Sequence, residues 1–121
     1  MGKAIEEYSL AELMKKFEET VNGNPSHIEG LNSVYLFDIT GDNGGAYQLQ
    51  FQDGKAMVLE GTEPPADCTL VMSLASFHLF ILGKLNGTMA FMTGKLKIKG
   101  DIGKALKIES ILKQYNVKDT L

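Results

Sequence analysis

The feature that most restricts how this chain can fold is a strictly alternating segment followed by a two-residue turn. Residues 47–52 read YQLQFQ, in which each apolar side chain is followed by a glutamine. This alternation is typical of a strand with one buried face and one wet face. Asp53-Gly54 follows at once and is a strong signal for a tight β-hairpin turn. The chain is therefore predicted to fold back into an antiparallel partner strand at 56–59.

The other elements follow from similar patterns. Ser9 and Glu12 form a capping box, after which apolar residues recur at helical spacing until Gly23. Further strands are predicted at 34–39, 68–72 and 95–99, a mostly apolar helical region from 73 onward, and a last helix capped by Asp101. Because a helical crossover joins the fourth and fifth strands, they are expected to be parallel neighbours or close to it.

This order of elements predicts an α+β fold, namely a five-stranded mixed sheet covered on one face by helices. Its first three strands form an antiparallel meander. A chain of 121 residues can bury one core, and residues 1–121 are predicted to form a single domain. The polar tail at 115–121 is expected to fray.

The composition and net charge restrict which kinds of molecule this protein is expected to bind. The net charge of −3 and the lack of arginine argue against nucleic acid. The overall field mildly repels anionic lipid, although some of the twelve lysines can touch a membrane surface locally. A single cysteine cannot form an internal disulfide, and the N-terminal residues lack the apolar core of a signal peptide. The cytoplasm is therefore the predicted compartment.

The chain carries no recognisable catalytic or metal-binding constellation. Its two histidines, His27 and His78, are about fifty positions apart, and His78 stands among apolar residues where a packed side chain is expected. Cys68 alternates inward with Leu70 and Met72, which predicts a buried and inert thiol. No catalytic residue, metal or cofactor is predicted.

The segment from Gly83 to Ile111 is unusually apolar for its length. Burial in an ordinary hydrophobic core would explain any single apolar side chain of this segment. Taken together, however, helices that are apolar on most sides must share one small sheet face, which leaves room for a cavity. Met89 and Met92 have the flexible, polarizable side chains that suit an adaptable wall.

Two motifs in this segment carry a resemblance to a known family. Residues 83–86 read G-K-x-N, and residues 90–100 read A-F-x-x-G-K-L-K-I-x-G before the last helix. This spacing resembles the sterol carrier protein 2 (SCP2) domain, and the earlier elements fit as well. The resemblance implies a hydrophobic tunnel that binds sterols, fatty acids or fatty acyl-CoAs and transfers them between membranes. Its walls would be Phe77, Ile81, Leu82, Met89, Phe91, Met92, Leu106 and Ile111.

The predicted function is that of a non-enzymatic, intracellular lipid-binding or lipid-transfer protein. Animal members of the family carry Gln where this chain has Thr93. A fatty acyl chain or fatty acyl-CoA is therefore the favoured ligand, and a sterol-like ligand is the alternative. The expected partners are a lipid and, transiently, a membrane, and the protein is a monomer or a weak dimer. One alternative is an interaction or regulatory module that uses the apolar surface for dimerisation. Another is a small enzyme with His78 or Asp38 as base, which requires a polar group that points into the cavity.

Overall fold

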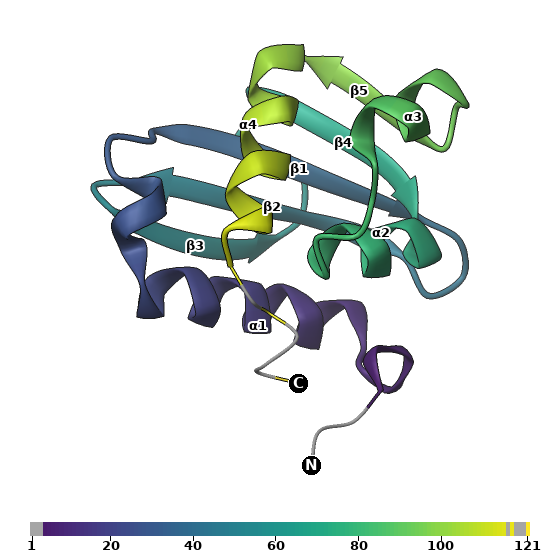
Figure 1. The fold of residues 1–121 in the computed structure, drawn as a ribbon, viewed down its shortest axis with the longest axis horizontal. Coiled ribbons are helices and arrows are strands. Elements are labelled where there is room, and N and C mark those ends of the chain that lie inside the picture. Colours follow the sequence, from purple (N-terminus) through teal and green to yellow (C-terminus); the bar gives the residue numbers. More distant parts are fainter. Residues whose placement is uncertain (1–3, 116, 118–120) are drawn as a thin grey trace.

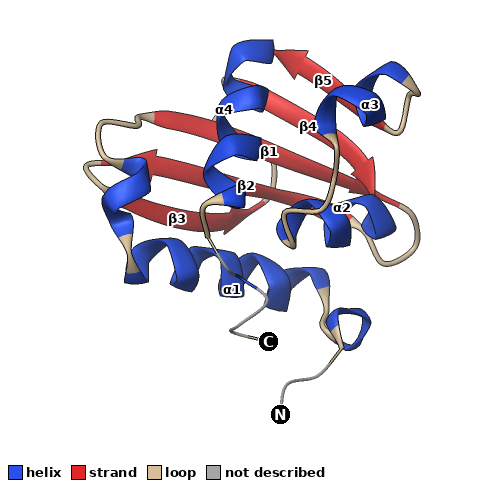
Figure 2. Cartoon of the chain, in the orientation of Figure 1, coloured by secondary structure: helices blue, strands red, loops and turns tan. Residues whose placement is uncertain are grey.

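The elements form in the predicted order in the computed structural model, which describes residues 4–115, 117 and 121 (Figures 1 and 2). The helices are α1 (Leu10–Gly23), α2 (Leu74–Ile81), α3 (Gly87–Met92) and α4 (Ile102–Lys113), with short 3-10 turns η1 (Ile5–Glu7) and η2 (Pro25–Ile28). The strands are β1 (Ser33–Thr40), β2 (Gly45–Gln52), β3 (Lys55–Glu60), β4 (Cys68–Ser73) and β5 (Leu96–Gly100).

The capping box starts α1 as predicted. The hydroxyl of Ser9 accepts the Glu12 N–H at 3.1 Å, and the Glu12 carboxylate accepts the Ser9 N–H at 2.8 Å. These bonds satisfy donors that a helix start otherwise leaves unpaired. The apolar face of α1 then packs into the core through Leu10, Leu13, Met14, Phe17 and Val21.

The sheet has the strand order β3-β2-β1-β4-β5 and is mixed, as predicted. The first three strands form the antiparallel meander, and the turn at Asp53-Gly54 joins β2 to β3. One row of inward side chains crosses four strands, because Tyr35 pairs with both Leu49 and Cys68, and Leu49 pairs with Val58. These side chains are shielded by the helices. The lysines of β5 and the glutamines of β2 lie on the other face, where the lysines are exposed but Gln48 is buried.

The expected parallel pairing of the last two strands is wrong. β4 and β5 are antiparallel, with Met72 opposite Leu96, and the parallel pair is β1 and β4. The connection between β4 and β5 contains two helices rather than one crossover helix. α2 leaves the end of β4 and the chain through α3 comes back to that same end, so β5 runs in the reverse direction (Figure 1).

The edge strand β3 is closed by α1. The Asn22 side chain donates to the Ala56 carbonyl and accepts the Ala56 N–H, both at 2.8 Å. The Glu18 carboxylate accepts the N–H of Val58, also at 2.8 Å. Because unpaired edge groups invite pairing with another chain, these three bonds protect this side of the sheet.

Part of the tail expected to fray is packed in the structure. The Tyr115 hydroxyl donates to the Asn24 carbonyl at 2.5 Å, and the Tyr115 ring meets the His27 ring edge-on at 5.1 Å between centroids. Val117 is buried against the core. Residues 116 and 118–120, which belong to the same predicted tail, lie outside the described residues.

Candidate functional site

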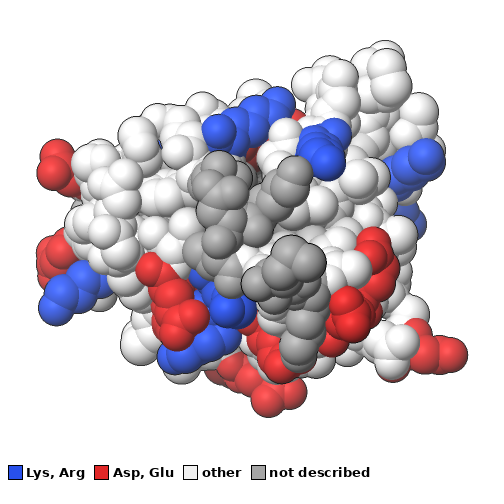
Figure 3. Space-filling view, turned by 60° about the horizontal axis from the view of Figure 1, so that its bottom comes forward, with Lys and Arg blue, Asp and Glu red and all other residues white. Residues whose placement is uncertain are grey.

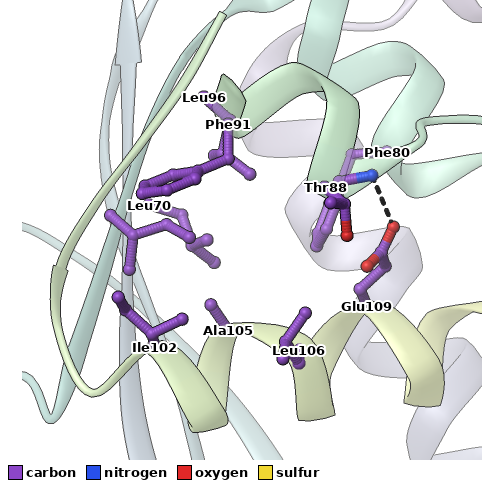
Figure 4. A pocket seen from close by; sticks show the side chains of 11 residues that line it. Leu70, Phe80, Thr88, Phe91, Leu96, Ile102, Ala105, Leu106 and Glu109 are labelled. Carbon is purple, nitrogen blue, oxygen red and sulfur yellow. Dashed lines mark hydrogen bonds between the residues drawn. The ribbon is translucent and has the colours of Figure 1, made fainter. Parts of the chain in front are cut away.

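A largely apolar pocket of about 210 Å³ lies between the β5 end of the sheet and the helices α2, α3 and α4 (Figure 4). Its floor comes from β4 and β5, and the helices form its walls. It is lined by Leu70, Phe80, Gly87, Thr88, Phe91, Leu96, Ile98, Ile102, Ala105, Leu106 and Glu109.

The floor of the pocket follows from strand alternation. Leu70 on β4 pairs with Ile98 on β5, so both side chains point to the same face of the sheet. Leu96 lies two residues before Ile98 and points the same way. The lysines between them, such as Lys97, point to the opposite face and stay exposed.

Side-chain caps start the two helices that form the pocket walls, and helical spacing places the lining residues on one face. The Asn86 side chain accepts the Met89 N–H at 3.0 Å and starts α3, and Asp101 caps α4 through the Lys104 N–H at 3.3 Å. On α4, Ile102, Leu106 and Glu109 follow one another at four- and three-residue steps, so they share one helix face. That face points toward α3 across the pocket (Figure 4).

The two walls are joined by one close contact. The Gly87 N–H donates to the Glu109 carboxylate at 2.7 Å (Figure 4). A Cβ at position 87 would lie only 2.7 Å from each carboxylate oxygen of Glu109, so any larger residue there would displace this carboxylate from its present position. Lys113 Nζ lies 3.6 Å from Glu109 Oε2, at the outer end of the same helix face. Glu109 therefore links α3 to α4 while lining the cavity.

The lining offers little for covalent or metal chemistry. Its polar side chains are Thr88 and Glu109, and neither His78 nor Asp38 lines the pocket. His78 is half-buried on α2, and its Nε2 has no hydrogen-bond partner among the described residues. Within the same residues, no three His, Cys, Asp or Glu side chains gather to hold a metal ion. The arrangement can enclose an apolar group.

Cys68 also lies away from this pocket. It is fully buried on β4, as its alternation predicts. Burial raises the pKa of the Cys68 thiol to about 11, with a smaller contribution from the nearby Asp101 carboxylate. At neutral pH the thiol therefore keeps its proton and is a poor nucleophile.

The structure distributes the eight proposed wall residues over three environments. Phe91 and Leu106 line the pocket. Met89 and Met92 on α3 are 62% and 79% exposed, and do not line it. The other four are part of the core or pack against it: Phe77, Ile81, Leu82 and Ile111.

The prediction omitted most of the lining residues. Strand alternation, which assigned Leu70 to the inward face, could have placed Leu96 and Ile98 in the floor. The spacing of Ile102, Leu106 and Glu109 could have placed the carboxylate on the same wall. No sequence signal indicates that Gly87 approaches Glu109, because that contact depends on how α3 and α4 pack.

Comparison with known proteins agrees with this geometry. The model of the SCP-2 sterol transfer family matches residues 12–113. Hydroxysteroid dehydrogenase-like protein 2 of Xenopus tropicalis is 41% identical over 119 residues, which cover 97% of this chain and 28% of that protein. The chain thus spans little more than a quarter of this relative's length.

Two solved structures have the same fold. The sterol carrier protein domain 2 of Helicoverpa armigera has a TM-score of 0.74 and 29% identity, covering 94% of this chain and 93% of that one. Sterol carrier protein 2 of Yarrowia lipolytica, in its apo form, has a TM-score of 0.68 and 28% identity, covering 93% and 96%.

In the described part of the chain, none of the helices has the length and apolar character needed to cross a membrane. The family match covers most of the chain, and the five-stranded sheet with its helices is shared with solved sterol carrier domains. The resemblance seen in the two motifs is therefore confirmed. The chain belongs to the SCP-2 sterol transfer family and has that family's lipid-binding type of fold.

Proposed function

We propose that this domain is a non-enzymatic carrier that holds the acyl chain of a fatty acid, a fatty acyl-CoA or a related lipid between α3, α4 and the β5 end of the sheet. The observation that carries the proposal is the pocket itself. Its lining is apolar apart from Thr88, Glu109 and the backbone at Gly87, and two of its helices present apolar side chains to solvent at the same place. An acyl chain has no polar groups, so burial against such a lining is enough to stabilise it there.

The size of the pocket favours part of a flexible chain over a rigid molecule. Its volume of about 210 Å³ exceeds the roughly 150 Å³ of an engineered cavity that admits benzene. It is below the roughly 300 to 1,000 Å³ of sites that enclose a drug-sized ligand. A chain can place its terminal methylenes in this volume and leave the rest at the mouth, whereas a sterol needs wider opening of the walls.

The charge of Glu109 favours entry of the apolar end first. A ligand carboxylate inside the pocket would face the Glu109 carboxylate, whereas Lys113, the cation 3.6 Å from Glu109, lies outside the pocket lining. A head group left at the mouth avoids this repulsion. Exposed lysines such as Lys95 and Lys107 on neighbouring segments are available to it there.

The expected affinity is that of a carrier that releases its ligand. Burying about ten methylenes at roughly 0.8 kcal/mol each gives on the order of 8 kcal/mol. Lost translational and rotational freedom offsets much of this gain. Micromolar binding or weaker is therefore expected.

The alternatives fit the described residues less well. A base needs a positioned partner, and Glu109 is already engaged by Gly87 and Lys113 while His78 and Asp38 are elsewhere. An interaction module would use the exposed Met89 and Met92, and it predicts a concentration-dependent dimer that yields no extractable lipid. The cytoplasm remains the predicted compartment, because the chain has a single cysteine.

Uptake of a fluorescent fatty acid by two matched variants tests the proposal. Phe91 and Leu79 are both 45% exposed, but only Phe91 lines the pocket. Phe91→Asp is expected to abolish uptake with the circular dichroism of a folded domain retained, and Leu79→Asp to keep uptake. Native mass spectrometry of freshly purified protein should also show a bound lipid. Equal uptake by both variants, or no bound lipid together with no uptake, contradicts the proposal.

A further inference from the structure

The backbone of β5 has a hydrogen-bonding partner on one side only. β5 is the last strand in the order β3-β2-β1-β4-β5 and pairs with β4 over Leu96–Gly100 (Figure 1). Every second residue of an antiparallel edge strand directs its N–H and C=O groups away from its neighbour. Among the described residues, none bonds to these outward groups of β5. The nearest bonds lie beyond its two ends, where the Lys95 N–H donates to the Ala90 carbonyl and the Asp101 N–H to the Asp67 carbonyl.

The other edge strand, β3, is protected by side chains. Asn22 and Glu18 of α1 form three hydrogen bonds with the backbone of Ala56 and Val58. In the described part of the chain, no side chain forms a bond of this kind with β5. Unpaired groups along an edge strand are a template for another strand. The fold therefore leaves one such template available, and it lies at β5.

The side chains of β5 give its two faces different chemistry. Lys97 and Lys99 are exposed on the face of the sheet that turns away from the helices, and neither forms an ion pair with a described residue. Ile98 lies on the other face, where it lines the pocket with Phe91 and Ile102. Phe91 is 45% exposed and Ile102 is 52% exposed. A strand added beside β5 would continue both faces, because successive side chains of a strand alternate between them.

We propose that the free edge of β5 binds an extended segment of a partner protein as a sixth strand, in which acidic residues alternate with apolar ones. The acidic side chains would lie beside Lys97 and Lys99, and the apolar ones beside Ile98 and Ile102. In strand addition, main-chain hydrogen bonds give affinity and alternate side chains give specificity. This interaction goes beyond the proposed carrier function, since the two lysines do not line the pocket.

The distribution of charge along the chain favours an acidic partner. Residues 84–113, which contain β5, carry seven lysines and two carboxylates, whereas the remainder carries five lysines and thirteen carboxylates. The formal charges are therefore +5 and −8 in a chain whose net charge is −3. The face that carries α1 is turned forward in Figure 3, where carboxylates gather over the lower part of the view. An acidic segment is attracted to the basic elements and repelled from α1.

The same lysines disfavour a second copy of this chain as the partner. Two β5 strands could pair about a two-fold axis so that both sheets keep their outer faces on the same side. With the greatest overlap, Lys97 of each copy would lie directly opposite Lys99 of the other. Like charges directly opposite each other destabilise a pair of strands, and lysines on an edge strand block such pairing. An acidic strand in the same position would form favourable pairs instead.

A model peptide tests the proposal with the full chain. The probe is a capped, fluorescein-labelled peptide of alternating glutamate and valine, about seven residues long, within the usual range of strand lengths. Fluorescence anisotropy is expected to show binding, and amide hydrogen exchange should slow at alternate residues of Leu96–Gly100 but not on β3. The same peptide with every backbone amide N-methylated cannot donate to β5 and should not bind. A peptide of alternating lysine and valine should not bind either.

A matched pair of variants tests the lysines. Lys97→Glu is expected to weaken binding of the acidic peptide about five-fold, because a favourable cross-strand pair becomes a like-charge pair. Lys97→Gln, which only removes the charge, should weaken it about two-fold. Lys55→Glu is the control, since Lys55 is also exposed but lies on the protected strand β3. All three variants should take up a fluorescent fatty acid like the wild type, because neither lysine lines the pocket.

Several outcomes would overturn the proposal. Equal binding of the N-methylated and unmodified peptides would show a contact through charge alone, without strand addition. Equal losses in Lys97→Glu and Lys55→Glu would place the contact away from β5. If the wild type dimerises in sedimentation experiments and the same β5 amides are protected without peptide, the edge binds a second copy. If no peptide binds while fatty-acid uptake persists, strand addition is wrong and the carrier function stands. Loss of fatty-acid uptake by the wild type would instead refute the proposed function.

Discussion

The two edges of the sheet are covered in different ways. At β3, the side chains of Asn22 and Glu18 form three hydrogen bonds with the strand backbone that hold α1 against it, and the apolar face of α1 is buried. At β5, the short helix α3 and the first turns of α4 leave large apolar side chains exposed. One hydrogen bond from Gly87 to Glu109 joins those two helices across the pocket.

We expect this difference to separate the part of the molecule that maintains the fold from the part that opens at lower free energy. Regions with few buried apolar contacts open at low free energy, while the well-packed core opens only with the whole domain. The proposed carrier function needs both properties, since the pocket walls must part for a ligand without unfolding. The β3 edge is therefore expected to dominate stability and the β5 edge to dominate uptake.

The largest expected effect compares one phenylalanine from each edge. Phe17 on α1 is fully buried, so Phe17→Ala should lower the free energy of unfolding by about 3 to 5 kcal/mol. Phe91 is half-exposed, so Phe91→Ala should cost less than about 1 kcal/mol and mainly reduce uptake. Urea denaturation measures the first effect and fatty-acid uptake the second. Similar losses of stability in the two variants would contradict the comparison.

The next effect concerns the contact between α3 and α4. Gly87→Ala should cost about 1.5 to 3 kcal/mol, because the new Cβ displaces the Glu109 carboxylate and breaks a charge-assisted hydrogen bond. In a Glu109→Ala background the same change should be neutral or slightly stabilising, since alanine is the better helix former. A double-mutant cycle measured by urea denaturation checks this coupling. Equal costs in both backgrounds would show that another contact joins the helices.

A smaller effect concerns the centre of the sheet, where the first turn of α4 covers β4. Burial raises the pKa of Cys68 to about 11, and burial also raises the pKa of Tyr35, whose hydroxyl donates to the Lys104 carbonyl at 2.9 Å. The folded state therefore holds these protons more tightly than the unfolded chain. These two groups should leave the free energy of unfolding unchanged below about pH 9, and lower it by about 1 to 2 kcal/mol as the pH rises toward 11.

Urea denaturation across this pH range checks the prediction, with Cys68→Ala as the control. The variant should lose less stability than the wild type over the same range, and Tyr35 should account for what remains. Identical pH slopes in the two proteins would mean that the thiol meets water in the folded state. In that case the opening at the β5 edge would extend to β4.

The sequence was sufficient for those parts of the fold that depend on local pattern. The capping box at Ser9, the turn at Asp53-Gly54 and the inward set of β4 follow from neighbouring residues, and the structure confirms them. The direction of β5 does not follow from such patterns. It depends on whether the helices after β4 continue across the sheet or return, and that is decided by their packing.

The candidate site was less predictable for the same reason. Apolar character and helical spacing identify side chains that prefer burial, but they do not distinguish a core wall from a cavity wall or an exposed rim. Phe77 and Phe91 look alike in sequence, yet the first is fully buried and the second lines the pocket. The position of Glu109 opposite Gly87 required the relative placement of two helices.

The smallest expected effect tests which end of the ligand lies inside the pocket at the β5 edge. Glu109→Gln keeps an oxygen that can accept the Gly87 N–H but removes the negative charge. If the methyl end enters first, burying the uncharged side chain beside methylenes should strengthen binding of dodecanoate and dodecanol alike, by about two- to five-fold. Displacement of a fluorescent fatty acid measures both affinities. A gain for dodecanoate alone would instead place the ligand carboxylate next to position 109, because only a charged head group loses repulsion when the charge of Glu109 is removed.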